Sequence, residues 1–288
     1  MDKQMLTREE IDRKKRIKKV LTVIRFIVIA FFLISFMFPV YWLGIGAFKV
    51  EGEVYSYPPV FVPGTFTLEN FAHAFTTFDG GKALLDSLVV AGANTLIVIS
   101  LGVLLAYSMG RFKTGGDDLS FFVISLLFAP PVVAAIPLFL IFSTLKMLDT
   151  YRVLYLSYVL FNMPFGVWIM KGFFEDIPHG IENAALLDGY TRWQAFRKYT
   201  LPLAVPGIAV TALFVFIFSW NEFLFALIFT RSSVETLTIT LSGMIGGHQI
   251  HWGELSALSL VAITPGIVLT LFFQKYLVRG LTFGAVKG

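Results

Sequence analysis

Long apolar runs without charged residues are the feature that most limits what this chain can fold into. The 288 residues are 56% hydrophobic and only 15% charged, whereas soluble domains average about 45–50% apolar and about 25% charged residues. A helical run of about 20 apolar residues is long enough to cross the hydrocarbon core of a bilayer. Several such runs occur here, which predicts an all-α polytopic membrane protein.

Six runs are long enough to be membrane-spanning helices. They cover Ile24–Phe48, Leu84–Met109, Leu119–Leu145, Val153–Met170, Ala204–Thr230 and Glu254–Tyr276. The first run is longer than the core of a signal peptide and lacks a clear cleavage site, so we interpret it as a retained span. The predicted organisation is a basic segment (1–23), a six-span domain (24–276) and a short tail (277–288).

Lysine and arginine are distributed unevenly between the connecting segments. Segments 1–25, 110–118, 171–203 and 275–288 carry eighteen of these residues, and segments 49–83, 146–152 and 231–253 carry five. Positive charge accumulates on the cytoplasmic side of membrane proteins. Both termini and the 171–203 loop are therefore predicted to be cytoplasmic. The net charge of +4 is explained by this topology, and nucleic-acid binding is not expected.

Motifs that would carry catalysis or bind a cofactor are missing from the sequence. It has no cysteine, no phosphate-binding G-x-x-x-x-G-K-[ST] loop, no H-E-x-x-H and no G-x-S-x-G. His248, His251 and Glu254 have a spacing that could hold a metal, but polar contacts in a glycine-rich outer loop explain them, so no metal site is predicted. We expect a protein that is not an enzyme, and whose transport would draw energy from ion coupling or from another subunit.

The long cytoplasmic loop carries the signals of two short helices. Asp176 and Pro178 resemble a helix start, because a capping carboxylate precedes a proline in the first turn. Gly189 is placed to end this helix in a left-handed conformation. Thr191 and Gln194 have the spacing of a capping box that begins a second helix. A loop of this length is more than a simple connection needs.

The stretch "ENAALLDGYTRWQAFRKYTLPLAVPG" resembles the cytoplasmic loop of permease subunits of ATP-binding-cassette importers, written E-A-A-x-x-x-G-x(9)-I-x-L-P. Aligned on Gly189, it departs from that pattern at two positions. Asn183 replaces the acid, with Glu182 one residue earlier, and Tyr199 replaces the isoleucine. The missing acid puts in doubt any salt bridge that the family's glutamate would make at this position.

Two further stretches narrow the resemblance. The ending "QKYLVRGLTFGAVKG" (Gln274–Gly288) and "SWNEFLFAL" (Ser219–Leu227) are similar to the second permease subunit of maltose-type carbohydrate importers. The resemblance covers nearly the whole chain and implies the type I importer permease fold, with six transmembrane helices and a coupling helix in the cytoplasmic loop.

The resemblance also implies roles for individual residues. In such importers the loop docks on the ATPase subunit, which here assigns coupling to Glu182, Asn183, Ala184, Ala185, Asp188, Gly189, Leu201 and Pro202. The family's tail reaches between the ATPase subunits, which assigns contacts to Gly284, Lys287 and Gly288, although Lys287 could equally be a solvated end. The outer loop that reaches toward the binding protein corresponds to Gly246, Gly247, His248, Gln249, His251 and Trp252.

Polar residues within the spans are candidates for the translocation path. Glu222 is an ionisable group inside a predicted span, and such groups are usually functional. The alternative is that Glu222 lies near the membrane surface, where water solvates its carboxylate. An aromatic ring beside polar groups suits a sugar, because the ring stacks on C–H groups while the polar groups bind hydroxyls. The candidates are Trp220, Asn221, Glu222, Asn94 and Asn162.

These features together predict a permease subunit of an ATP-driven sugar or oligosaccharide importer in a bacterial-type inner membrane. Its expected partners are a second permease, two ATP-binding subunits that hold ATP and Mg²⁺, an extracytoplasmic solute-binding protein and the lipid bilayer. Import of glycerol, glycerol phosphate or another polyol is an alternative. An ion-coupled transporter would be expected to show paired intramembrane charges or inverted repeats, and a membrane-embedded enzyme an acid–base or metal constellation.

Overall fold

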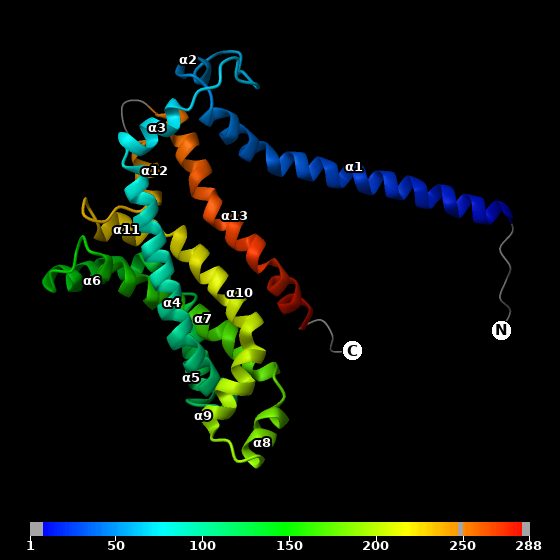
Figure 1. Ribbon diagram of the computed structural model, residues 1–288, viewed down its shortest axis with the longest axis vertical. Coiled ribbons are helices and arrows are strands. Elements are labelled where there is room, and N and C mark those ends of the chain that lie inside the picture. Colours follow the sequence, from blue (N-terminus) through cyan, green and yellow to red (C-terminus); the bar gives the residue numbers. More distant parts are fainter. Residues whose placement is uncertain (1–7, 247–249, 284–288) are drawn as a thin grey trace. The chain divides into compact units, whose positions relative to one another are not determined.

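Helices make up nearly all of the secondary structure in the computed structural model, which describes residues 8–246 and 250–283 (Figure 1). They are α1 (Arg8–Ala47), α2 (Glu51–Val54), α3 (Glu69–Thr76), α4 (Gly80–Phe112), α5 (Gly116–Leu126), α6 (Pro131–Thr144), α7 (Tyr151–Asp176), α8 (His179–Leu187), α9 (Arg192–Ala195), the π-helical turn η1 (Phe196–Thr200), α10 (Leu201–Trp220), α11 (Leu224–Phe229), α12 (Leu237–Gly243) and α13 (Trp252–Phe283). No β-strand occurs in these ranges, which confirms the all-α prediction.

The number of spans agrees with the prediction when one bent pair counts as a single span. Within the described ranges, the helices long and apolar enough to cross a membrane are Lys15–Ala47, Gly80–Phe112, Tyr151–Asp176, Arg192–Trp220 and Trp252–Tyr276. Helices α5 and α6 pass the same test together, but they are bent by 91° at the break between them. Five continuous spans and one broken span therefore account for the six apolar runs.

The predicted continuous third span, Leu119–Leu145, is wrong. The chain leaves the helix after Leu126 and restarts at Pro131. Pro130 holds an extended backbone (φ −65°, ψ 125°), and Pro131 stands in the first turn of α6. Proline has no N–H to continue a helix, but that absence costs nothing in a first turn. The proline pair therefore ends one helix and begins the next.

The predicted fifth span, Ala204–Thr230, is also interrupted. Helix α10 ends at Trp220 and α11 begins at Leu224. At the other end, the helix begins well before Ala204, since α9, η1 and α10 form one helical stretch from Arg192. The second short helix predicted for the 171–203 loop is thus the start of a span, and not a separate element.

The fourth span is longer than predicted, and this changes the role of Asp176. Helix α7 continues past Met170 to Asp176, which is its last residue. Asp176 therefore does not begin the following helix, whose N-cap position is occupied by Pro178 without a side-chain cap.

The chain divides into two units, residues 1–71 with 252–260, and residues 72–251 with 261–288. In the second unit α4, α7 and α10 pack against one another (Figure 1). A glycine allows part of this close approach, because a Cβ on Gly166 would lie 2.8 Å from Cγ1 of Val98. Small residues commonly let membrane helices approach in this way. In the first unit the Asn70 amide donates to the backbone oxygens of Ala47 (3.0 Å) and Lys49 (2.8 Å).

Candidate functional site

The polar segment between α7 and α10 begins with α8, a helix with a well-defined C-terminal end. Gly189 has a φ of +85°, the left-handed conformation predicted for it. The amides of Gly189 and Tyr190 donate to the oxygens of Leu186 (3.1 Å) and Ala185 (3.0 Å), which closes the helix in the manner of a Schellman motif. The chain then turns directly into the next helix.

The predicted capping box of Thr191 and Gln194 is confirmed. The Thr191 hydroxyl accepts from the Gln194 amide at 3.3 Å, and the Gln194 side chain accepts from the Thr191 amide at 2.8 Å. Two amides at the start of α9 are thereby satisfied. Phe196 and Thr200 in η1 are buried, so the helix that begins at this cap is held by packing as it continues into α10.

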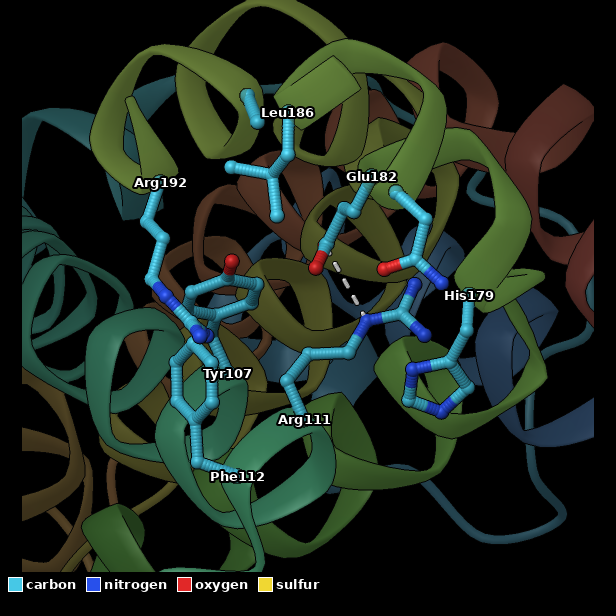
Figure 2. Close-up of a pocket in the computed structure, with 9 residues that line it drawn as sticks. Tyr107, Arg111, Phe112, His179, Glu182, Leu186 and Arg192 are labelled. Carbon is cyan, nitrogen blue, oxygen red and sulfur yellow. Dashed lines mark ion pairs between the residues drawn. The ribbon is translucent and has the colours of Figure 1, made fainter. Parts of the chain in front are cut away.

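Glu182 faces the interior of this segment. Its Oε1 lies 3.2 Å from Nε of Arg111 at the end of α4, and accepts a hydrogen bond from the Thr200 hydroxyl at 2.5 Å. The side chains of Arg111 and Glu182 are only 1% and 12% exposed. One carboxylate therefore ties α8 to α4 through the ion pair shown in Figure 2, and to the turn that leads into α10 through Thr200.

Five of the exposed residues in the second half of α8 and just after it form a surface that we call the α8 face: Asn183, Ala184, Leu187, Asp188 and Gly189. Leu187 is 90% exposed, although the sequence analysis did not single it out. Its exposure could have been predicted, because Leu187 directly precedes Asp188 and Gly189 in a polar loop. Ala185, by contrast, is 3% exposed and faces inward.

The remaining predicted coupling residues lie in the first turn of α10. Leu201 packs against the buried cluster that includes Phe174 and Phe196, whereas Pro202 is exposed. Leu201 thus belongs to the packing that supports the segment, and Pro202 to its surface.

A pocket of about 210 Å³ lies between α4, α8 and α9. Its lining consists of Tyr107, Arg111, Phe112, His179, Glu182, Asn183, Leu186, Arg192 and Ala195. Figure 2 shows Arg111 reaching toward Glu182 across the pocket, with Tyr107 and Arg192 on one side of it and His179 on the other. The pocket is thus polar and carries charges of both signs.

Two of the path candidates lie inside the helix packing. The Asn162 amide donates to Oδ1 of Asn94 (3.0 Å) and to Oγ of Ser219 (3.0 Å), and the Ser219 hydroxyl is 2.9 Å from the same Asn94 oxygen. All three residues are buried. The cluster joins α4, α7 and α10 through the kind of hydrogen bonds that link membrane helices.

The other three path candidates lie at the break between α10 and α11. Trp220 is buried and its indole N–H donates to the Ala262 oxygen at 3.1 Å. The exposed Asn221 side chain donates to the Ile217 oxygen at 2.8 Å. The Glu222 carboxylate accepts from amides in the first turn of α11, including that of Phe225 at 2.9 Å, as a helix-capping group does.

On the predicted outer side, two carboxylates that were not predicted from the sequence accept hydrogen bonds from backbone amides of loops. Oδ1 of Asp149 accepts from the Arg231 amide at 2.8 Å, and Oδ2 accepts from the Ser233 amide at 3.0 Å. Burial raises the pKa of the Asp149 carboxyl, but hydrogen bonds from these amides outweigh burial and hold the pKa at about 2.

The second of these carboxylates, Asp86, accepts from the Tyr151 hydroxyl (2.6 Å) and from the Glu235 amide (2.9 Å). Asp149 thus links the loop before α7 to the loop before α12, and Asp86 links α4 to the start of α7 and to the loop before α12. Hydrogen bonds to a charged carboxylate are stronger than those between neutral groups, which makes these links effective.

The predicted outer binding loop is described only in part. Gly247, His248 and Gln249 lie outside the described residues, as do the tail residues Gly284, Lys287 and Gly288. The His251 ring meets the edge of Phe78, with centroids 5.0 Å apart. Gly246 ends the described part before the gap, and Trp252 begins α13 after it. Among the residues that the structure describes, no group of three metal-ligating side chains occurs.

Comparisons with known proteins agree with the resemblance. The "Trehalose/maltose transport system permease protein MalG" of Thermococcus litoralis is 33% identical over 281 residues, which cover 96% of this chain and 99% of that protein. The "Trehalose transport system permease protein SugB" of Mycobacterium tuberculosis is 36% identical over 231 residues, with 79% and 84% covered.

A solved bacterial ABC transporter involved in the import of the acidic polysaccharide alginate shares the fold. One of its chains superposes with a TM-score of 0.75 at 18% identity, covering 94% of this chain and 99% of that chain. The family model described as "Binding-protein-dependent transport system inner membrane component" matches residues 98–283. The chain therefore belongs to the family of inner membrane components of binding-protein-dependent transport systems.

Proposed function

We propose that this chain is one of two permease subunits in an ATP-driven importer for a sugar or oligosaccharide, in which it provides half of the translocation path. The transport permeases for trehalose and maltose among its relatives support the substrate class. The partners would be a second permease, two ATP-binding subunits that hold ATP and Mg²⁺, and an extracytoplasmic solute-binding protein. This chain would contribute no ATPase site.

The observation that carries the proposal is the construction of the cytoplasmic segment. The α8 face exposes Leu187 on a helix whose other side is tied through Glu182 to α4 and η1. An exposed apolar side chain among small and polar neighbours suits insertion into a partner. Movement of α8 would then reach the membrane through the continuous helix that starts at Arg192.

Other parts of the chain receive roles under the same proposal. Both termini and the 171–203 loop would be cytoplasmic. The tail residues Gly284, Lys287 and Gly288 would contact the ATP-binding subunits, and the outer loop 246–252 would contact the solute-binding protein. At the break after α10, the exposed amide of Asn221 is the favoured group for binding substrate hydroxyls, because broken membrane helices commonly form substrate sites.

The test is ATP hydrolysis by the reconstituted four-subunit complex with its binding protein, measured across a panel of sugars and polyols. Stimulation by a sugar supports the proposal, whereas stimulation by glycerol, glycerol phosphate or another polyol alone would replace the substrate class. Transport that follows a proton gradient, with no panel member stimulating hydrolysis, would contradict ATP-driven import altogether.

Orientation can be tested separately, because the chain has no cysteine of its own. A cysteine introduced at Lys113, an exposed position of the predicted cytoplasmic segment 110–118, should react with a membrane-impermeant maleimide only after cells are opened. A cysteine introduced at Lys146, in the predicted outer loop, should react in spheroplasts. The reverse pattern would contradict the proposed topology.

A further inference from the structure

The guanidinium group of Arg111 is buried in the pocket between α4, α8 and α9 with most of its donors unused. Only its Nε is near an acid, at 3.2 Å from Glu182. Its Nη1 and Nη2 have no hydrogen-bond partner among the described residues, although the side chain is 1% exposed. Buried donors are normally satisfied. These two nitrogens therefore mark a place where an acceptor belongs.

The second arginine of the pocket, Arg192, has no acid partner among the described residues. The Arg192 guanidinium lies over the Phe112 ring, 5.1 Å from its centroid, and makes no ion pair with the residues that the structure describes. Leaving His179 aside, the pocket holds two arginines against the single carboxylate of Glu182. One positive charge is in excess.

A single carboxylate matches this surplus in both charge and geometry. Guanidinium groups bind carboxylates through paired N–H donors, and Arg111 has its terminal nitrogens free for that purpose. The pocket, at about 210 Å³, is several times larger than the roughly 30 Å³ that one water molecule occupies in the liquid. It has room for the end of an acidic side chain. A doubly charged phosphate would overcompensate the single excess charge.

The position of the pocket indicates where such a carboxylate would come from. Asn183 belongs both to the pocket lining and to the α8 face, and Leu186 of the lining directly precedes Leu187 of that face. A subunit docked on the α8 face would therefore also cover the pocket. At Asn183, where the family pattern has an acid, this chain presents a neutral amide, so no second carboxylate of its own competes for the arginines.

We propose that this pocket receives an aspartate or glutamate side chain of the ATP-binding subunit, held by Arg111 and Arg192. The inference rests on the proposed function, since it requires that subunit to dock on the α8 face. It adds an ionic contact to the apolar one at Leu187, and it gives the buried Arg111 its missing acceptor.

Zero-length cross-linking of the assembled complex tests the contact directly. In an Arg192→Lys variant the lysine amine replaces the guanidinium, and a carbodiimide will join it to a carboxylate only at ion-pair distance. We expect a cross-link from position 192 to an aspartate or glutamate of the ATP-binding subunit, identified by mass spectrometry. The matched control is Arg197→Lys, an exposed basic position of η1 that does not line the pocket, and it should give no such link.

A binding measurement with neutral variants gives the second readout. Arg192, like Arg197, is exposed in the chain alone, but it would lose solvent when the ATP-binding subunit covers the pocket. Arg192→Gln should therefore weaken the affinity of the permease for that subunit by about tenfold or more, as expected when one member of a charge pair desolvated by docking is removed. Arg197→Gln should change the affinity less than about threefold, as expected for a charge outside the pocket that stays exposed.

The outcomes separate this inference from the proposed function. If the complex assembles and hydrolyses ATP, but position 192 links only to Glu182 or to nothing, the carboxylate contact is wrong and the importer proposal stands. Equal effects of the two glutamine variants would also overturn the contact. If the unmodified permease does not bind an ATP-binding subunit at all, the proposed function itself fails.

Discussion

The buried ion pair between Arg111 and Glu182 allows a quantitative prediction about the stability of the permease. The change is Glu182→Gln, which keeps the shape of the side chain and its capacity to accept from Thr200, but removes its charge. Because the Arg111 side chain is 1% exposed, its guanidinium would then be a buried charge without a counter-charge. Breaking a buried pair from one side costs about 3–5 kcal/mol. We expect about 3 kcal/mol, since glutamine retains a hydrogen bond.

The neighbouring pair of Lys171 and Glu175 provides the matched control. Its atoms are closer, with Nζ 2.7 Å from Oε1, but the Glu175 side chain is 48% exposed. Exposed pairs contribute about 0–1 kcal/mol, so Glu175→Gln should lower the unfolding free energy by less than 1 kcal/mol. Burial, and not distance, is thus the variable that separates the two substitutions.

The assay is unfolding of the purified permease by sodium dodecyl sulfate in bicelles, followed by circular dichroism. Adding Arg111→Gln to Glu182→Gln should restore part of the loss, because the uncompensated charge is removed. The reasoning is refuted if Glu182→Gln costs no more than Glu175→Gln, or if the double variant is less stable than the sum of the single changes.

Three further predictions concern other parts of the chain. Gly189→Ala should lower the free energy of unfolding by about 1–2 kcal/mol, because a φ of +85° is unfavourable for a residue with a Cβ, even where open space surrounds that Cβ. Gly189→Asn should lower it less. Equal melting temperatures for the unmodified protein and both variants would contradict this reasoning. Asn162→Ala should cost about 1–2 kcal/mol in the same unfolding assay by removing two interhelical hydrogen bonds, whereas Asn221→Ala, at an exposed amide, should cost far less. The pKa of Asp149 is lowered from 3.8 to about 2, so its stabilisation is present above about pH 4 and is lost as the pH falls toward 2. The shift is equivalent to roughly 2 kcal/mol, which solvent screening of this half-buried group reduces to about 1 kcal/mol; Asp149→Asn should remove that pH dependence, and an unchanged pH profile would show that the loop amides do not stabilise the carboxylate.

Features encoded by neighbouring residues could be predicted from the sequence. The apolar runs predict the membrane spans, because the thickness of the bilayer sets how many apolar residues a span needs. Gly189 and the Thr191 capping box depend on local backbone geometry, which a few residues determine. The break at Pro130 and Pro131 is equally local, because a proline inside an apolar run invites a kink, although the run was predicted as a single span.

Features that depend on distant residues could not be predicted in the same way. Arg111 and Glu182 are far apart in the sequence, and nothing local indicates that they pair. The inward orientation of Glu182 had one available signal, since it is three residues before Ala185 and therefore shares a helix face with it. Whether that face was the buried one required the packing of α4 and η1 against α8.

The π-helical turn η1 lies between the Thr191 cap and the rest of the span, and it affects how α10 is rotated relative to that cap. Each residue of an α-helix advances the chain by about 100°, and a π turn accommodates one residue more than an α-helical turn would. Deleting a single residue from Phe196–Thr200 would therefore convert η1 to an α-helical turn and leave α10 in nearly the same rotation relative to the Thr191 cap. A deletion in the α-helical part, between Leu201 and Ser219, would instead turn the rest of α10 by about 100°, so that Ser219 would leave its contact with Asn94. The turn is thus the place where the chain can lose one residue without a change in the orientation of the span.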